Sequence, residues 1–304
     1  MSYIIRPRSN CALVYELTNK KTMGTQRGQK LNALQRLLPE GLIASAQWLD
    51  DAGYSSALRS KYVSSGWLEQ PARGIYKRPG AAPQWQHLVV SLQSLMRLPV
   101  SVGGLTALEV LGYGHYIPLG TLKRVNLYAE VRLPKWLDEV GPNLQFQTHN
   151  AHRLFKTDTV TRAIDALPKI PSEQDEAQAK PLGGGLRQHV WGDRAWPMIM
   201  STPERAILEF LDEVPKRQSF EHAADLFTGL ANLSPRRMQE LLETCDSIKV
   251  KRLFLWFAER NAHAWFARLD FTSIDTGRGK RMIAKNGRLD AKYQITVPEG
   301  MYGD

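Results

Sequence analysis

The chain has 304 residues, of which 43% are hydrophobic and 23% are charged, and these fractions are ordinary for a globular protein. Its net charge is +10, and the excess lies at one end: residues 1–80 hold 12 Lys/Arg against 5 Asp/Glu, whereas residues 81–304 hold 28 against 25. A positive first quarter is typical of a segment that meets a polyanion. The two cysteines, Cys11 and Cys245, are too few for a zinc site of their own or for a disulfide framework.

The first 25 residues fit no regular element, and we treat residues 1–25 as an N-terminal arm of uncertain order. They show no long apolar run after their arginines, so we expect no secretory signal. No window of the sequence approaches the roughly 20 apolar residues that a membrane-spanning helix needs. We therefore expect a cytoplasmic protein that does not act in a membrane.

Residues 26–80 show the order of elements found in a small DNA-binding domain. Helices are predicted at 26–38, 45–52 and 56–65, and short strands at 66–70 and 73–79. Pro39 ends the first helix, Ser45 caps the second, and Gly53 provides the turn before the third. The order helix, helix, turn, helix, hairpin predicts a winged helix-turn-helix.

The third helix of this domain is expected to present polar residues to DNA, because Leu58, Tyr62 and Val63 form its apolar stripe. Short hydroxyls mixed with Arg and Lys suit phosphates and base edges. The major-groove candidates are Ser56, Arg59, Ser60 and Lys61. Phosphate contacts are expected from Lys30, Arg73, Lys77 and Arg78, and Gln47 is expected to touch a phosphate or an adenine.

Each of these positions has a plainer alternative. Any single Lys or Arg is equally well explained as a solvated surface residue, whereas Tyr76 and Trp67 are expected to pack the hairpin onto the helices. As a group the basic residues still favour DNA. We expect that Arg59→Ala combined with Arg73→Ala abolishes operator binding while the protein stays folded.

Residues 81–304 mix both kinds of element. The fold class is therefore α+β: a winged helix-turn-helix at 26–80, followed by a larger mixed α/β C-terminal domain at 81–304. Helices are predicted at 85–97, 106–111, 201–211, 219–230, 234–245 and 250–261, and strands at 124–128, 144–148, 198–200 and 293–297.

The sequence carries no recognisable active site. It has no glycine loop before Lys-Ser/Thr and no Gly-x-Ser-x-Gly elbow. His149 and His152 lack a third metal ligand at a credible spacing, so surface histidines are the expectation. We expect no catalytic residue, no metal and no cofactor, and hence a protein that is not an enzyme.

Several short motifs resemble those of the AbiEi antitoxin family. Gly66-Trp67-Leu68, Arg73-Gly74-Ile75-Tyr76 and Arg78-Pro79 resemble its winged-helix domain. The helix start Ser201-Thr202-Pro203-Glu204-Arg205-Ala206 and the closing Gly287-Arg288-Leu289-Asp290 resemble its C-terminal domain. The likeness covers most of the chain beyond residue 25.

The resemblance implies an antitoxin of a type IV toxin–antitoxin system that serves phage defence by abortive infection. Such a protein binds inverted repeats in its own promoter and represses it. Its C-terminal domain counteracts an AbiEii-like nucleotidyltransferase toxin, and a stable complex with that toxin is not required. The positive residues of the last quarter are the candidate antitoxin surface: Lys249, Lys251, Arg252, Arg278, Lys280, Arg281, Lys285 and Arg288. Trp256 and Trp265 lie among them and are candidates for partial exposure.

Two other functions fit the same sequence. One is a nuclease that the winged helix guides to DNA, since Asp290-Ala291-Lys292 resembles the end of a nuclease motif; it would cut plasmid DNA with Mg²⁺ and lose this on Asp290→Ala. The other is a transcription regulator with a ligand-sensing C-terminal domain. It would show a ligand-induced melting shift, and its neighbouring gene would not encode a nucleotidyltransferase.

Overall fold

A computed structural model describes residues 26–114, 123–141, 143–167 and 178–301. The arm expected at residues 1–25 lies outside these ranges. The chain divides between Ala82 and Pro83 into two compact units, which we call unit 1 and unit 2 and describe separately. None of the helices in the described ranges has the length and apolar character that crossing a lipid bilayer requires.

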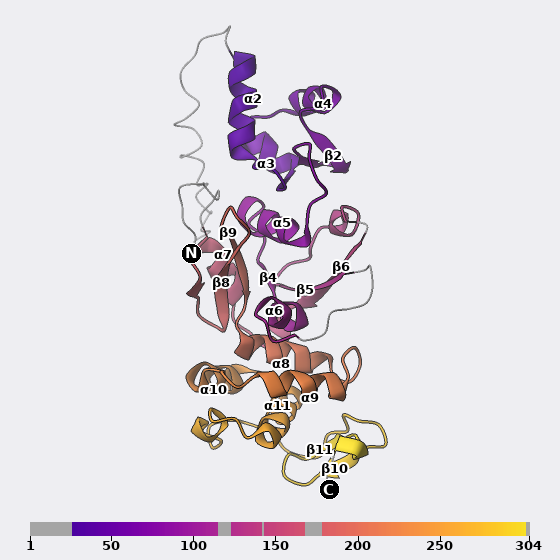
Figure 1. The fold of residues 1–304 in the computed structure, drawn as a ribbon, viewed down its shortest axis with the longest axis vertical. Helices are drawn as coiled ribbons and strands as arrows, with labels where there is room; N and C mark the ends of the chain where they lie inside the picture. Colours follow the sequence, from indigo (N-terminus) through magenta and orange to yellow (C-terminus); the bar gives the residue numbers. More distant parts are fainter. Residues whose placement is uncertain (1–25, 115–122, 142, 168–177, 302–304) are drawn as a thin grey trace, which may run out of the picture. The chain divides into compact units, whose positions relative to one another are not determined.

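Unit 1 combines three helices with a three-stranded antiparallel sheet in the order β1-β3-β2. Its elements are α2 (Gln26–Leu37), β1 (Ile43–Ser45), α3 (Ala46–Asp51), α4 (Ser56–Ser64), β2 (Glu69–Ala72) and β3 (Ile75–Lys77) (Figure 1). The three helices and the hairpin agree with the sequence-based expectation, whereas β1 was not predicted. The hairpin also starts later than expected, because the amides of Trp67 and Leu68 bond to the carbonyl of Tyr62 and close the end of α4.

The local signals in unit 1 act as their chemistry predicts. The hydroxyl of Ser45 accepts the amide of Trp48 at 3.1 Å and so caps α3. Gly53 has φ of +84°, a left-handed conformation that suits glycine at a helix end. These two signals set the positions of α3 and α4 around an apolar core of Leu34, Leu38, Leu42, Ile43, Leu49, Tyr62, Leu68 and Ile75.

Unit 2 is built on a six-stranded mixed sheet in the order β6-β5-β4-β9-β8-β7. The pairs β5/β6 and β4/β9 are parallel and the other pairs are antiparallel. The strands are β4 (Val100–Val102), β5 (Lys123–Ala129), β6 (Leu144–Asn150), β7 (Lys180–Pro181), β8 (Leu186–Trp191) and β9 (Trp196–Ser201). Strands β5, β6 and β9 were predicted, and β4 and β8 were not.

The helices of unit 2 follow the predicted order except for one at 159–165, which was not predicted, and a small hairpin closes the described chain. They are α5 (Trp85–Val90), α6 (Gly104–Val110), α7 (Thr159–Asp165), α8 (Pro203–Glu213), α9 (Phe220–Gly229), α10 (Pro235–Thr244) and α11 (Ile248–Asn261), with the hairpin strands β10 (Arg288–Asp290) and β11 (Ile295–Val297). The single helix expected at 85–97 instead passes into a π-helical turn, η1 (Ser91–Leu95). Within that turn the Gln93 amide bonds to backbone groups of Val100 and Ile199 and joins the turn to the sheet.

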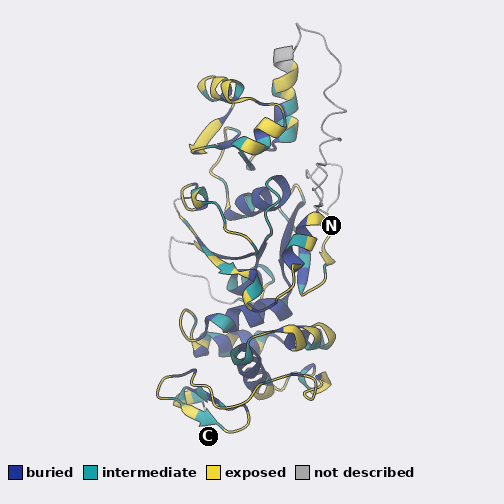
Figure 2. Ribbon diagram, turned by 180° about the vertical axis from the view of Figure 1, so that it is seen from behind, coloured by how far each residue is buried: buried dark blue, intermediate teal, exposed yellow. Residues whose placement is uncertain are grey.

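Helix α8 lies at the centre of unit 2 and is buried along nearly its whole length (Figure 2). It packs against α6, α10 and α11. Because it is covered on so many sides, even its charged residues are enclosed, and these must be paired inside the protein.

The Ser201–Ala206 motif supplies that pairing. Arg205 binds Glu209 at 2.8 Å and donates to the carbonyl of Gly184 at 2.8 Å. The second oxygen of Glu209 accepts the amide of Gly104 at 2.9 Å and the Ser201 hydroxyl at 2.8 Å. Thr202, the N-cap residue of α8, makes no side-chain cap bond, and the Ser201 hydroxyl bonds to Glu209 in the buried network.

Glu204 extends this network to α10. Its carboxylate is 1% exposed, accepts the amide of Ser234 at 2.8 Å and pairs with Arg237 at 3.0 Å. Burial alone raises the pKa of such a carboxyl, but the hydrogen bonds from Arg237 and the Ser234 amide lower the pKa of Glu204 overall. The motif that carries the family resemblance is thus a structural clamp between α8, α10 and the sheet.

Candidate nucleic-acid interface

The outer face of α4 is exposed and carries small or basic side chains. Tyr62 is buried and Leu58 and Val63 are partly buried, as predicted for the apolar stripe. The exposed positions recur at helical spacing and carry small or basic side chains: Ser56, Ala57, Ser60, Lys61 and Ser64. Helix α4 contains no acidic residue. A face of short side chains without negative charge can approach base edges and phosphates closely.

Arg59 does not belong to this face, and its assignment to the major groove is wrong. It is 5% exposed, and its guanidinium donates to the Asp50 carboxylate and to the Tyr54 carbonyl, the latter at 2.6 Å. The hydrogen bond to Asp50 raises the pKa of Arg59, so this buried group keeps its charge. Position 59 lies three residues before Tyr62 and shares its face of the helix. Arg59 therefore joins α4 to the end of α3 and does not reach DNA.

The tip of the hairpin is held against α3. Gly74 has φ of +73°, and its carbonyl accepts the amide of Ala46 at 2.7 Å. Arg73 precedes it at the turn and is exposed, whereas Tyr76 is buried as expected. Arg73 is thus presented by a turn that backbone bonding fixes in place.

The predicted phosphate contact of Lys77 is also wrong. Lys77 lies opposite Glu69 in the hairpin register, is 6% exposed, and forms an ion pair with that carboxylate at 2.6 Å. Its ammonium also donates to the carbonyl of Gly80 at 3.2 Å. The ammonium of Lys77 is paired within the hairpin region and is therefore not available to a phosphate. Arg78, next in sequence, is partly buried and donates weakly to the carbonyl of Gln35 at 3.4 Å.

The remaining candidates of unit 1 are accessible. Lys30 is exposed on α2, and Gln47 is exposed on α3 with its amide bonded to Asp51 at 2.9 Å. Trp67 was expected to pack the hairpin, yet its side chain is 47% exposed beside the end of α4. An exposed tryptophan next to a polar helix face is a contact candidate that the sequence pattern did not single out.

The candidate antitoxin surface of unit 2 separates into two groups. Lys251 and Arg252 are each 3% exposed, and Lys249 donates to the carbonyls of Asp212 and Val214 at 2.6 and 2.8 Å. Burial lowers the pKa of Lys249. The assignment of Lys251 and Arg252 to a surface is wrong because neighbouring elements enclose this part of α11, whereas Lys249 is partly buried and its ammonium is bound by the two carbonyls. The other five are exposed: Arg278, Lys280, Arg281, Lys285 and Arg288.

The enclosed Arg252 supports the exposed group from beneath. Its guanidinium donates to the carbonyls of Thr276 and Gly279 at 2.7 Å each and of Gln294 at 3.2 Å. The loop 276–288, which we call the basic loop, contains no acidic residue. Trp256 and Trp265 are buried at 1% and 3%, so the prediction of their partial exposure is wrong.

Asp290 has a structural role in the described part of the chain. Its carboxylate accepts the indole N–H of Trp256 at 3.1 Å and the amides of Lys292 and Tyr293 at 3.0 and 2.8 Å. These bonds shape the turn between β10 and β11. Asp290, the last residue of the Gly287–Asp290 motif, thus has a structural role that requires no catalytic function.

Comparison with known families matches both units. Residues 27–119 match the family described as "Transcriptional regulator, AbiEi antitoxin N-terminal domain", and residues 190–298 match "Transcriptional regulator, AbiEi antitoxin, Type IV TA system". Among solved structures, the RV2827C protein from Mycobacterium tuberculosis is 16% identical over 91% of this chain and 92% of its own, with a TM-score of 0.48. No curated protein matches.

Proposed function

Because the chain belongs to the AbiEi family of antitoxins and transcriptional regulators of type IV toxin–antitoxin systems, we propose that unit 1 is a winged helix-turn-helix that binds operator DNA. In this proposal α3 and α4 form the helix-turn-helix and the hairpin β2–β3 is the wing. The single observation that carries it is the exposed, acid-free face of α4. The bound site is an inverted repeat in the protein's own promoter, and binding represses it.

Two kinds of contact follow from the exposed residues. Ser56, Ser60 and Lys61 face base edges from the centre of α4. The phosphates are met by Lys30, Arg73 and Arg78, and Gln47 adds a neutral contact from α3. With Lys61 included, four cations reach DNA. The slope of the logarithm of the binding constant against the logarithm of the salt concentration is therefore no steeper than about −3.6 for one domain.

Unit 2 counteracts a nucleotidyltransferase toxin of the AbiEii type, without requiring a stable complex. The exposed cations of the basic loop are the proposed surface for this role: Arg278, Lys280, Arg281, Lys285 and Arg288. The pinning of this loop by Arg252 supports the proposal, since a fixed array of charges loses little entropy on binding. Repression of a promoter takes place where the chromosome lies, so the protein acts in the cytoplasm.

The DNA proposal is tested by fluorescence anisotropy of the full chain with its own promoter duplex and with a scrambled duplex. We expect Ser60→Glu to remove the preference for the promoter, because it places a negative charge at the centre of the reading face. Lys61→Ala with Arg73→Ala weakens both duplexes and lowers the salt slope by about 2.

The control is Lys135→Ala, which removes an exposed cation on unit 2 and so changes the overall charge by the same amount as Ser60→Glu. All variants should melt at the parent temperature, since every substituted side chain is exposed. Unchanged promoter affinity in both Ser60→Glu and the double variant would exclude α4 and the wing as the DNA-binding face.

A further inference from the structure

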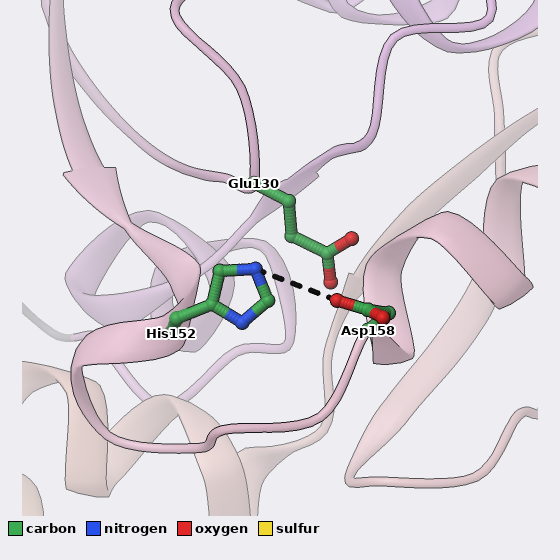
Figure 3. Close-up of side chains that lie close together, drawn as sticks. All are labelled: Glu130, His152 and Asp158. Atoms are coloured by element: carbon green, nitrogen blue, oxygen red, sulfur yellow. Dashed lines mark ion pairs between the residues drawn. The ribbon is translucent and has the colours of Figure 1, made fainter.

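Three side chains of unit 2 direct potential metal ligands toward one point (Figure 3). They are Glu130, His152 and Asp158, and one ligand atom of each lies within 4.8 Å of the others. The imidazole Nε2 of His152 is 3.6 Å from the Asp158 carboxylate. This cluster lies outside the proposed DNA and toxin surfaces.

The topology of the sheet explains why these residues meet. Strands β5 and β6 are parallel neighbours, and Ala129 pairs with Asn150 at their ends. Glu130 follows the first strand directly, and His152 lies in the 3-10 turn η3 (Ala151–Arg153) that follows the second. Carboxyl ends of adjacent parallel strands meet at one edge, where ligand sites are common. Asp158 arrives from the start of α7.

Glu130 caps α7 in place of Asp158, so the Asp158 carboxylate is not used in capping. An aspartate at the N-cap position ordinarily accepts amides of the first turn, but Asp158 makes no such bond. Glu130, which follows β5, takes this role: its Oε1 accepts the amide of Val160 at 2.9 Å and its Oε2 the amide of Thr161 at 3.1 Å. The helix is capped without Asp158, whose carboxylate turns toward His152 (Figure 3).

The capping bonds of Glu130 also suit it as a ligand. A carboxylate offers about four lone-pair positions. Glu130 uses one on Oε1 and two on Oε2, where the hydroxyl of Thr161 also donates. One position on Oε1 therefore remains. Hydrogen bonds that fix a ligating carboxylate are typical of metal sites, because they orient the ligand before the ion arrives.

We propose that Glu130, His152 and Asp158 bind a divalent transition ion of the Zn²⁺ type. An imidazole with two carboxylates suits Zn²⁺, whereas Ca²⁺ takes six to eight oxygens and Mg²⁺ an octahedron of them. The two carboxylates offset the charge of the ion. The Asp158 side chain is 76% exposed and that of His152 is 32% exposed, which gives the ion a path and leaves a fourth position to water.

His149, which the sequence places beside His152, has a different role. Its ring stacks on Tyr128 at 4.7 Å, and its Nε2 lies 3.1 Å from both Asn126 and Glu213. The two further ligands beside His152 are therefore Glu130 and Asp158, which come from different elements. Bound metal would tie the ends of β5 and β6 to the start of α7.

The test is isothermal titration of the EDTA-treated full chain with ZnCl₂, together with Co²⁺ absorption spectra that report the coordination geometry. We expect one ion per chain, and at least about tenfold weaker binding in Asp158→Asn and in His152→Asn. Zn²⁺ should raise the melting temperature of the parent but not of these variants.

Asp138→Asn, an exposed aspartate on the same unit, is the matched control and should bind Zn²⁺ as the parent does. Asp158→Asn removes no cap and is expected to fold, so its result is interpretable even if His152→Asn is unstable. The proposal is overturned if the parent takes up no Zn²⁺ at micromolar concentrations, or if both ligand variants retain its affinity and stoichiometry.

Discussion

Arg59 offers the sharpest test of how unit 1 is held together. Arg59→Ala removes a guanidinium that donates to Asp50, to the Tyr54 carbonyl at 2.6 Å and to the Ala46 carbonyl at 3.3 Å. Its charge also lies 5.6 Å from the ring centre of Tyr76. The substitution leaves these groups without their donor and opens a cavity at a position that is 5% exposed.

The expected loss is about 3–5 kcal/mol, the range found when one partner of a buried charged pair is removed. The Tyr54 bond alone accounts for about 1.5–3 kcal/mol, because it joins a charged donor to a buried acceptor. We discount the Asp50 contribution, since that side chain is 46% exposed and regains water. A unit of roughly 60 residues has a total stability of about 3–9 kcal/mol, so most of it is at stake.

The assay is calorimetric melting of the full chain, with limited proteolysis to locate the opened segment. In Arg59→Ala we expect the transition of unit 1 to move to much lower temperature and cleavage to concentrate within residues 26–82. Unit 2 should melt as before. Lys61→Ala, exposed on the same helix, serves as the control and should change stability by less than about 0.5 kcal/mol.

This outcome reverses the expectation from the sequence that Arg59→Ala with Arg73→Ala leaves the protein folded. Any loss of DNA binding in Arg59→Ala would then arise from unfolding. Were Arg59→Ala to keep the parent melting profile and still lose the promoter, Arg59 would be a base-reading residue after all, and its role in joining α4 to the end of α3 would be refuted.

Three further predictions concern unit 2. Glu204→Leu leaves the Ser234 amide and Arg237 without their acceptor, and it should lower the free energy of unfolding in urea by about 3–5 kcal/mol. Glu204→Gln should lose less stability, because its amide oxygen can still accept these hydrogen bonds. Equal stability of the two variants would refute the role of Glu204 in joining α8 to α10. Arg252→Met should speed amide hydrogen exchange in residues 276–294 and weaken toxin neutralisation without touching the toxin, and unchanged exchange would show that the basic loop is not pinned by it. Burial, and after it the charge of Arg217, lowers the pKa of His149 to about 4. Between this value and the unfolded pKa near 6.5, the imidazole is protonated in the unfolded chain but neutral in the folded chain. Stability should therefore fall by about 1–3 kcal/mol as the pH drops from 6.5 toward 4, and His149→Gln should flatten that part of the profile.

Local signals explain which elements were predictable. Ser45, Gly53 and Pro203 mark helix ends by chemistry that needs no partner from elsewhere in the chain. Strands β1 and β4 span three residues each, too short for an alternating pattern to be recognised. Strand β8 contains Arg187 and His189 and lacks a clear apolar run, so its place beside β9 depends on pairing and not on composition.

The errors at the candidate site share one physical cause. Arg59, Lys77 and Arg252 were read as surface residues because charged side chains are seldom fully buried without a partner. Each has partners that the local sequence does not reveal: a carboxylate nine residues away for Arg59, a cross-strand glutamate for Lys77, and three carbonyls between residues 276 and 294 for Arg252. Burial of a charge is decided by the tertiary fold, and helical spacing alone predicts only the side on which it lies.

Charge at the proposed DNA face therefore has to be counted after the internal pairs are set aside. Arg59 is neutralised by Asp50 and Lys77 by Glu69, so each pair removes one cation and one anion from what DNA can meet. The net charge of unit 1 is unchanged by this, but the remaining cations are the accessible ones, with Lys61 on α4 and Arg73 at the hairpin turn. Attraction to a polyanion depends on where charge can reach a phosphate and not on its total. The internally paired Arg59 and Lys77 hold α3, α4 and the hairpin in position. They therefore set the geometry with which Lys61 and Arg73 are presented.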